Sequence, residues 1–131
     1  MAIKAMTQFA ALLFVVASAG VGAFQVALGL GAPWGEFTLG GRWQGSLPPK
    51  ARLIPLLSLV LLAGFSTVIL VRAGFTLPLL QEQSQSLAWV VVGYCVLGTI
   101  ANAITSSRRE RQLWLPVVLC MLASSLVVAT S

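Results

Sequence analysis

Residues 52–72 read RLIPLLSLVLLAGFSTVILVR, and this stretch decides the fold class. No residue between Arg52 and Arg72 is charged, and almost all are apolar. A helix needs about 20 such residues to cross a bilayer. A membrane barrel strand would instead alternate apolar and polar residues at every second position. The unbroken run therefore predicts a transmembrane helix.

Three further stretches share this character, at about residues 6–30, 87–105 and 113–130, and the span quoted above is expected over about residues 53–73. The apolar sequence continues past a possible signal-cleavage site at residues 17–19, so we expect the N-terminal helix to be retained. We predict a single all-α domain over residues 1–131, an integral membrane bundle of four transmembrane helices.

The composition agrees with this class of protein and excludes others. Of 131 residues, 58% are hydrophobic and 8% are charged, whereas a soluble domain carries about 25% charged residues. Four spans leave no room for a soluble catalytic domain. The chain has no histidine, and Cys95 and Cys120 form no CxxC pair, so no metal site or cofactor is expected. No catalytic residue can be assigned.

The net charge of +5 bears on topology rather than on nucleic acid, because no basic stripe is interleaved with stacking aromatic residues. Lysine and arginine of short loops favour the cytoplasmic side. Six basic residues fall in the first and third loops, against Lys4 and Arg72 on the other side. They are Arg42, Lys50, Arg52, Arg108, Arg109 and Arg111. We expect both termini outside and a structured first loop, residues 31–52, in the cytoplasm.

Small residues recur at every fourth position of the first span, at Ala19, Ala23, Ala27 and Gly31. Such a stripe favours close helix contact in lipid, within the chain or with a second copy. Pro55 and Pro116 are both expected in first helical turns, where their missing N–H is harmless.

Polar residues within the spans are few: Gln25, Ser58, Ser66, Thr67, Tyr94, Thr99, Asn102, Ser124 and Ser125. Serine and threonine can bond their own backbone carbonyls. Amides in hydrocarbon are costly without a partner. We expect Gln25 and Asn102 either to bond each other or to line a cavity.

The first loop mixes aromatic residues with turn formers. Pro33 is expected to end the first helix, and Gly40-Gly41 suggests a small hairpin that pairs residues 37–39 with residues 42–44. In this hairpin Glu36 would meet Arg42, as a structural ion pair or as part of a ligand site. Trp34 and Trp43 fit an interfacial aromatic belt or a ligand cover.

Polar groups of both basic loops are expected to share one side of the membrane. A pocket there would suit an amphiphile with an anionic or zwitterionic head, although a solvated, topology-setting loop explains the arginines equally well. The candidate ligand-binding residues are Gln25, Trp34, Glu36, Arg42, Trp43, Asn102 and Arg108.

The segment from Gly31-Ala32-Pro33-Trp34-Gly35 through Gly40-Gly41, Leu47-Pro48 and Arg52 resembles small bacterial membrane proteins of uncharacterised function. The later segments Asn102-Ala103-Ile104-Thr105, Ser107-Arg108-Arg109-Glu110-Arg111 and Trp114 to Pro116 are similar to the same group. The resemblance implies a bacterial inner membrane protein and supplies no activity. The chain also resembles small multidrug transporters in length and helix count. However, it has Gln25 where they carry a membrane-embedded glutamate.

Three classes of function stay open. The first is a protein that binds or transports a small amphiphile or lipid. The second is a structural or accessory subunit, in a homo-oligomer or a larger membrane complex. The third is an enzyme acting on a membrane-dissolved substrate, which no nucleophile–base pair or metal set supports.

Overall fold

The computed structural model describes the backbone of residues 2–131 and the side chains of residues 4–131, and this range is helical without a strand. Four long helices, of 20 to 28 residues each, make up the fold. At 1.5 Å per residue, the shortest is about 30 Å long. The all-α prediction is confirmed, and all four helices are long and apolar enough to cross a membrane. They are α1 (Ala2–Gly29), α2 (Leu53–Arg72), α3 (Gln81–Ile104) and α4 (Arg108–Ala129).

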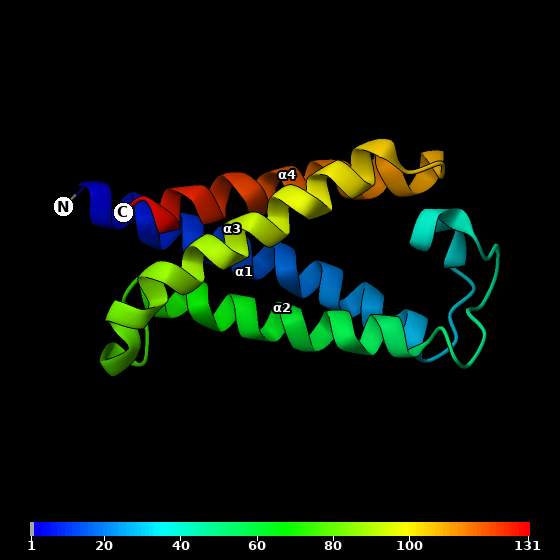
Figure 1. Cartoon of the computed structure of the whole chain (residues 1–131), viewed down its shortest axis with the longest axis horizontal. Coiled ribbons are helices and arrows are strands. Elements are labelled where there is room, and N and C mark those ends of the chain that lie inside the picture. Colours follow the sequence, from blue (N-terminus) through cyan, green and yellow to red (C-terminus); the bar gives the residue numbers. More distant parts are fainter. Residues whose placement is uncertain (1) are drawn as a thin grey trace.

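Successive helices run in opposite directions, so the bundle has two distinct ends (Figure 1). The start of α1, the end of α4 and the α2–α3 connection, which contains a short 3-10 helix η3 (Pro78–Leu80), lie at one end. The loops at residues 30–52 and 105–107 lie at the other. Each helix contacts two main neighbours, since α1 lies against α2 and α4, and α3 lies against α4 and α2.

The interior is a narrow apolar core. Phe14, Ile69, Val91 and Val128 are fully buried in it. The outward faces are apolar as well, because Phe9, Val16, Val60, Leu97 and Ile104 are each at least two-thirds exposed. A soluble bundle would place charged and polar residues there.

α3 and α4 begin earlier than the apolar pattern indicates, at Gln81 and Arg108. At α4 the cause is an N-cap, since the Ser107 hydroxyl accepts the N–H of Glu110 at 3.2 Å. Apolarity marks only the part of a helix suited to hydrocarbon, so it misses a polar first turn. Pro116 consequently lies inside α4. The expectation from the sequence, that it lies in the first turn, is wrong.

Of the two open possibilities for the small-residue stripe, packing within the chain does not occur at Ala19 and Ala23. Ala19 and Ala23 are exposed, whereas Ser18 and Gly22, one position earlier, are buried. A Cβ on Gly22 would lie 3.3 Å from Leu59 Cδ1, so this glycine permits the close approach of α1 and α2. Phe14 occupies the same face one turn before Ser18 and sets which side of α1 turns inward.

α1 ends before Pro33. The N–H of Gly31 donates to Leu28 O at 3.1 Å, and that of Ala32 donates to Ala27 O at 2.9 Å. This pair of bonds is the Schellman arrangement, which needs a left-handed residue, and Gly31 has φ +100°. The chain therefore leaves the helix at Gly31, two residues before the proline.

The predicted hairpin is wrong, because residues 35–41 form two 3-10 turns, η1 (Gly35–Phe37) and η2 (Leu39–Gly41). Backbone N–H groups of this segment donate to carbonyls three residues back, as in Gly41 N–H to Thr38 O at 2.9 Å. Leu39, Gly40 and Gly41 all have positive φ, between 51° and 74°. Such backbone cannot be a strand.

The first loop packs against the end of α1. Leu47 is 1% exposed and forms a small core with Leu28 and Ala51. Gly35 donates its N–H to Gly45 O at 2.9 Å, and a Cβ there would lie 2.3 Å from Trp43 O. The loop is thus a folded element, held by apolar burial and by a glycine that no other residue can replace without movement.

Candidate functional site

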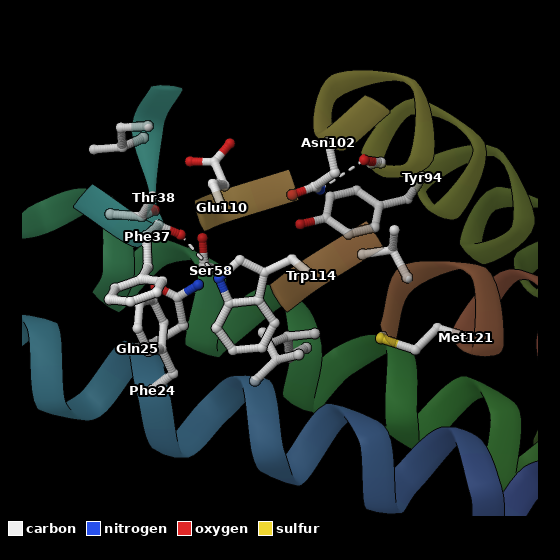
Figure 2. Close-up of a pocket in the computed structure, with 15 residues that line it drawn as sticks. Phe24, Gln25, Phe37, Thr38, Ser58, Tyr94, Asn102, Glu110, Trp114 and Met121 are labelled. Atoms are coloured by element: carbon white, nitrogen blue, oxygen red, sulfur yellow. Dashed lines mark hydrogen bonds between the residues drawn. The ribbon is translucent and has the colours of Figure 1, made fainter. Parts of the chain in front are cut away.

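All four helices and the first loop enclose a cavity of about 190 Å³ near the loop end of the bundle. Figure 2 shows its wall, with Trp114 of α4 near the centre and Tyr94 of α3 extending toward it. The lining residues are Val21, Phe24, Gln25, Phe37, Thr38, Leu39, Ser58, Leu62, Tyr94, Gly98, Asn102, Glu110, Trp114, Val118 and Met121.

Helical spacing explains how these side chains converge. Tyr94, Gly98 and Asn102 follow one another at four-residue intervals on α3, and Glu110 and Trp114 do so on α4. Residues four apart share one face of a helix. Each helix therefore presents a stripe to the cavity.

The first loop covers the cavity because it is bonded to the start of α4. Glu110 Oε2 accepts the N–H of Gly40 at 3.0 Å. The Ser107 hydroxyl donates to Glu36 O at 2.6 Å, and the Trp114 indole N–H donates to Phe37 O at 2.8 Å. These three bonds join segments about 70 residues apart in the sequence.

Several polar groups on the wall have no protein partner among the described residues. The side chains of Gln25, Thr38, Ser58 and Tyr94 make no hydrogen bond there. Asn102 uses only its Nδ2, which donates to Gly98 O at 2.7 Å, so its Oδ1 is free. The cavity therefore offers convergent groups that water or a ligand would satisfy.

Gln25 and Asn102, the two amides singled out in the sequence, both line the cavity and do not bond each other. Serine and threonine elsewhere in the spans behave as expected, since Thr67 and Thr99 donate to carbonyls four residues back. The ligand-binding roles of the two amides stay predictions.

Glu36 lies outside the cavity wall, and its expected pairing with Arg42 is wrong. Glu36 Oε1 instead lies 3.1 Å from Arg109 Nη1, in a largely exposed ion pair. The Arg42 guanidinium lies over the Trp43 ring, 4.9 Å from its centroid. The cause is the 3-10 path of the loop, which turns Glu36 toward α4.

The remaining sequence candidates also lie apart from the cavity. Trp34 is exposed and stacks on Phe24 at a centroid distance of 6.0 Å. Trp43 packs on the small core around Leu47. Arg108 is exposed, and its side chain makes no hydrogen bond, ion pair or ring contact with the described residues. None of these residues reaches the cavity wall.

Glu110 is the acidic residue that sequence reasoning missed. It is 8% exposed and lines the cavity. The signal was present, because Ser107 and Glu110 match the S-x-x-E pattern of a capping box. In a capping box the glutamate bonds back to the N-cap N–H. Here the Ser107 N–H donates to Thr105 Oγ1 at 3.3 Å, and Glu110 is left to bind the first loop.

An apolar groove adjoins the cavity. It lies between α1 and α4, has a volume of about 420 Å³, and shares Val21 and Trp114 with the cavity wall. Its other lining residues are apolar or small, namely Val16, Ala17, Gly20, Pro116, Val117 and Cys120. The cavity, with its polar groups, and the apolar groove therefore share a wall at Val21 and Trp114.

Within the described part of the chain, no three histidine, cysteine, aspartate or glutamate side chains lie close enough to hold a metal ion. Cys95 is buried in the core and Cys120 borders the groove. Comparison with protein-family models, with curated proteins and with solved structures found no match to this chain.

Proposed function

We propose that this protein is a multi-pass membrane protein that binds a small single-chain amphiphile, with the polar head in the cavity and the alkyl chain in the groove between α1 and α4. The observation that carries the proposal is that a cavity with unpartnered polar groups and an apolar groove lie against the same two side chains, Val21 and Trp114. A ligand that fits both parts must itself have a polar and an apolar end.

The surroundings of the groove support a ligand that arrives from lipid. The outward faces of the helices are apolar, and the groove opens between two helices long enough to span the bilayer. The alkyl chain would enter sideways from hydrocarbon. The head would enter a chamber in which Gln25, Ser58, Tyr94 and Asn102 replace its hydrogen bonds to water.

The six-to-two distribution of basic residues supports a topology with the cavity near the cytoplasmic face and both termini outside. The two basic loops meet at one end of the bundle, as that topology requires (Figure 1). The proposed location is the bacterial inner membrane.

The test fills the cavity without disturbing the backbone. Gly98 lines the cavity, and a Cβ there would meet no atom within 4 Å, so Gly98→Leu extends into free space. Gly93 is a matched control on the same helix, since it is exposed, lies off the cavity and also has open space around its Cβ. Both glycines are helical, so both variants gain helix propensity.

Native mass spectrometry of protein in dodecyl maltoside micelles would count bound single-chain probes. We expect Gly98→Leu to lose a probe that the wild type and Gly93→Leu retain at one per chain. Equal retention in all three proteins, or no retention by the wild type, would contradict the proposal.

A second candidate function is that of an accessory subunit. It is favoured by Ala19 and Ala23, which lie exposed in a groove between α1 and α2, beside Ser18, whose buried hydroxyl has no partner. Association with another membrane helix would cover this face. Ala23→Leu would then abolish a complex seen by cross-linking and leave amphiphile binding unchanged.

A further inference from the structure

We infer that the head group bound in the cavity is an organic cation, an amine or quaternary ammonium, with Glu110 as its counter-charge. This inference rests on the proposed function and adds the chemical class of the ligand. The sequence alone had suggested an anionic or zwitterionic head. The decisive point is which charged side chains reach the cavity wall.

Among the described side chains, Glu110 is the one charged group that lines the cavity. Glu110 as a whole residue is 8% exposed, and it forms no ion pair within the described residues, where Glu36 and Arg109 form the single ion pair. Oε2 accepts one backbone N–H, from Gly40, and Oε1 accepts none. A carboxylate with one free oxygen and no cation beside it can still accept a charge-assisted hydrogen bond or ion pair from a ligand. A cationic ligand would supply that partner.

The arginines near this end of the bundle do not supply the counter-charge. Arg108 and Arg109 are exposed, and Arg109 is engaged by Glu36. Arg111 donates to Thr105 O at 3.1 Å. Exposed charges act through water, whose high dielectric constant weakens their interactions, whereas contacts inside the cavity are screened less. The short-range field of Glu110 therefore decides which head is preferred.

The rest of the wall also fits an organic cation. Phe24, Phe37, Tyr94 and Trp114 place four aromatic rings on the wall, and Trp114 meets Phe24 edge-on at 4.7 Å. Aromatic faces attract ammonium groups, and tryptophan does so best. A hard metal ion would need six or more oxygen ligands, while much of this wall is hydrocarbon. An anionic head would find no cationic side chain at all.

The experiment compares three probes with the same dodecyl chain, so that their partition into the micelle differs only through the head. They are dodecyltrimethylammonium, the net-neutral dodecyldimethylamine oxide and dodecyl sulfate, measured above neutral pH by native mass spectrometry and by the shift in unfolding temperature. We expect the wild type to bind the ammonium at least about tenfold more tightly than either of the others, as one charge-assisted contact provides.

The matched variants are Glu110→Gln and Glu36→Gln. The first keeps an oxygen to accept the Gly40 N–H and removes the charge from the cavity. The second removes a carboxylate that lies outside the cavity wall. We expect Glu110→Gln to lose the preference for ammonium while it still binds the amine oxide, and Glu36→Gln to keep that preference.

The outcomes separate the two proposals. If the wild type binds none of the three probes, the proposed function fails and the inference fails with it. If it binds all three equally or prefers sulfate, or if Glu110→Gln keeps the preference for ammonium, the inference alone is overturned. Should Glu110→Gln fail to fold, the order in which the wild type binds the three probes still tests the inference.

Discussion

Glu110 and Gly40 lie 70 residues apart in the sequence, and a hydrogen bond of 3.0 Å joins the N–H of Gly40 to Glu110 Oε2. This contact ties the first loop to the start of α4 and covers the cavity at the same time. It uses a glycine at φ +71°, where other residues are strained, and a glutamate that a capping box would have kept within its own helix. The loop and the site are thus one structure.

The loop should fail when Gly35 acquires a side chain. A Cβ there would lie 2.3 Å from Trp43 O and 2.5 Å from Gly45 O, so Gly35→Ala must open the loop. We expect a loss of about 1–3 kcal/mol in the free energy of unfolding and faster tryptic cleavage after Lys50. Gly45→Ala is the control, since a Cβ there meets no atom within 4 Å. Equal melting temperatures for the two variants would show that the loop is not packed as described.

The indole of Trp114 should contribute a measurable hydrogen bond. Trp114→Phe keeps an aromatic ring but leaves Phe37 O without its donor, which lies at 2.8 Å. We expect a cost of about 0.5–1.5 kcal/mol and faster hydrogen exchange in residues 35–41. Trp89→Phe is the comparison, because Trp89 is 47% exposed and makes no hydrogen bond. The interpretation does not hold if both variants exchange at the wild-type rate.

Adjacent positions on α1 should respond differently to a large side chain. Gly22→Leu forces its side chain against Leu59 and should cost about 1–3 kcal/mol by overpacking. Ala23→Leu places the same side chain on an exposed position. We expect the second variant to melt with the wild type in detergent. A larger loss at Ala23 than at Gly22 would mean that α1 is rotated from the orientation seen here.

The ion pair between Glu36 and Arg109 should add little to stability. Arg109 is 66% exposed and Glu36 is 30% exposed, so solvent screens the pair. We expect Glu36→Gln to change the free energy of unfolding by less than about 1 kcal/mol. The midpoint of denaturation should also change little between low and high salt. A loss of several kcal/mol in the free energy of unfolding would contradict this prediction and show that Glu36 is required for stability.

The orientation in the membrane can be tested with cysteine labelling on a background that carries Cys95→Ala and Cys120→Ala. Gln44 and Gln83 are exposed at opposite ends of the bundle, so each is replaced by cysteine in turn. The distribution of basic residues predicts that an impermeant thiol reagent added to intact spheroplasts labels Gln83→Cys and spares Gln44→Cys. The opposite pattern would invert the topology.

The sequence by itself determined the number of long helices and their apolar character. A long, mostly apolar run without a charge, such as residues 53–71 of α2, has one stable backbone in hydrocarbon, because every N–H and C=O must bond within the segment. The amides Gln25 and Asn102 could also be singled out, since polar groups in such segments are rare. These properties are local, because each can be recognised from the sequence of a single segment.

The tertiary structure alone decided which faces meet and which charges pair. On α1 the small-residue stripe and the true contact face differ by one position, a rotation of about 100°. The pattern of small residues cannot resolve that difference, because both faces carry them. In the loop, Leu39, Gly40 and Gly41 have positive φ, so the backbone forms 3-10 turns and not the expected hairpin. On this path Glu36 forms its ion pair with Arg109. Glu110 lines the cavity because the Ser107 N–H, its usual partner in a capping box, donates to Thr105 instead. The carboxylate then accepts the N–H of Gly40. Such choices depend on neighbours that are far away in the sequence.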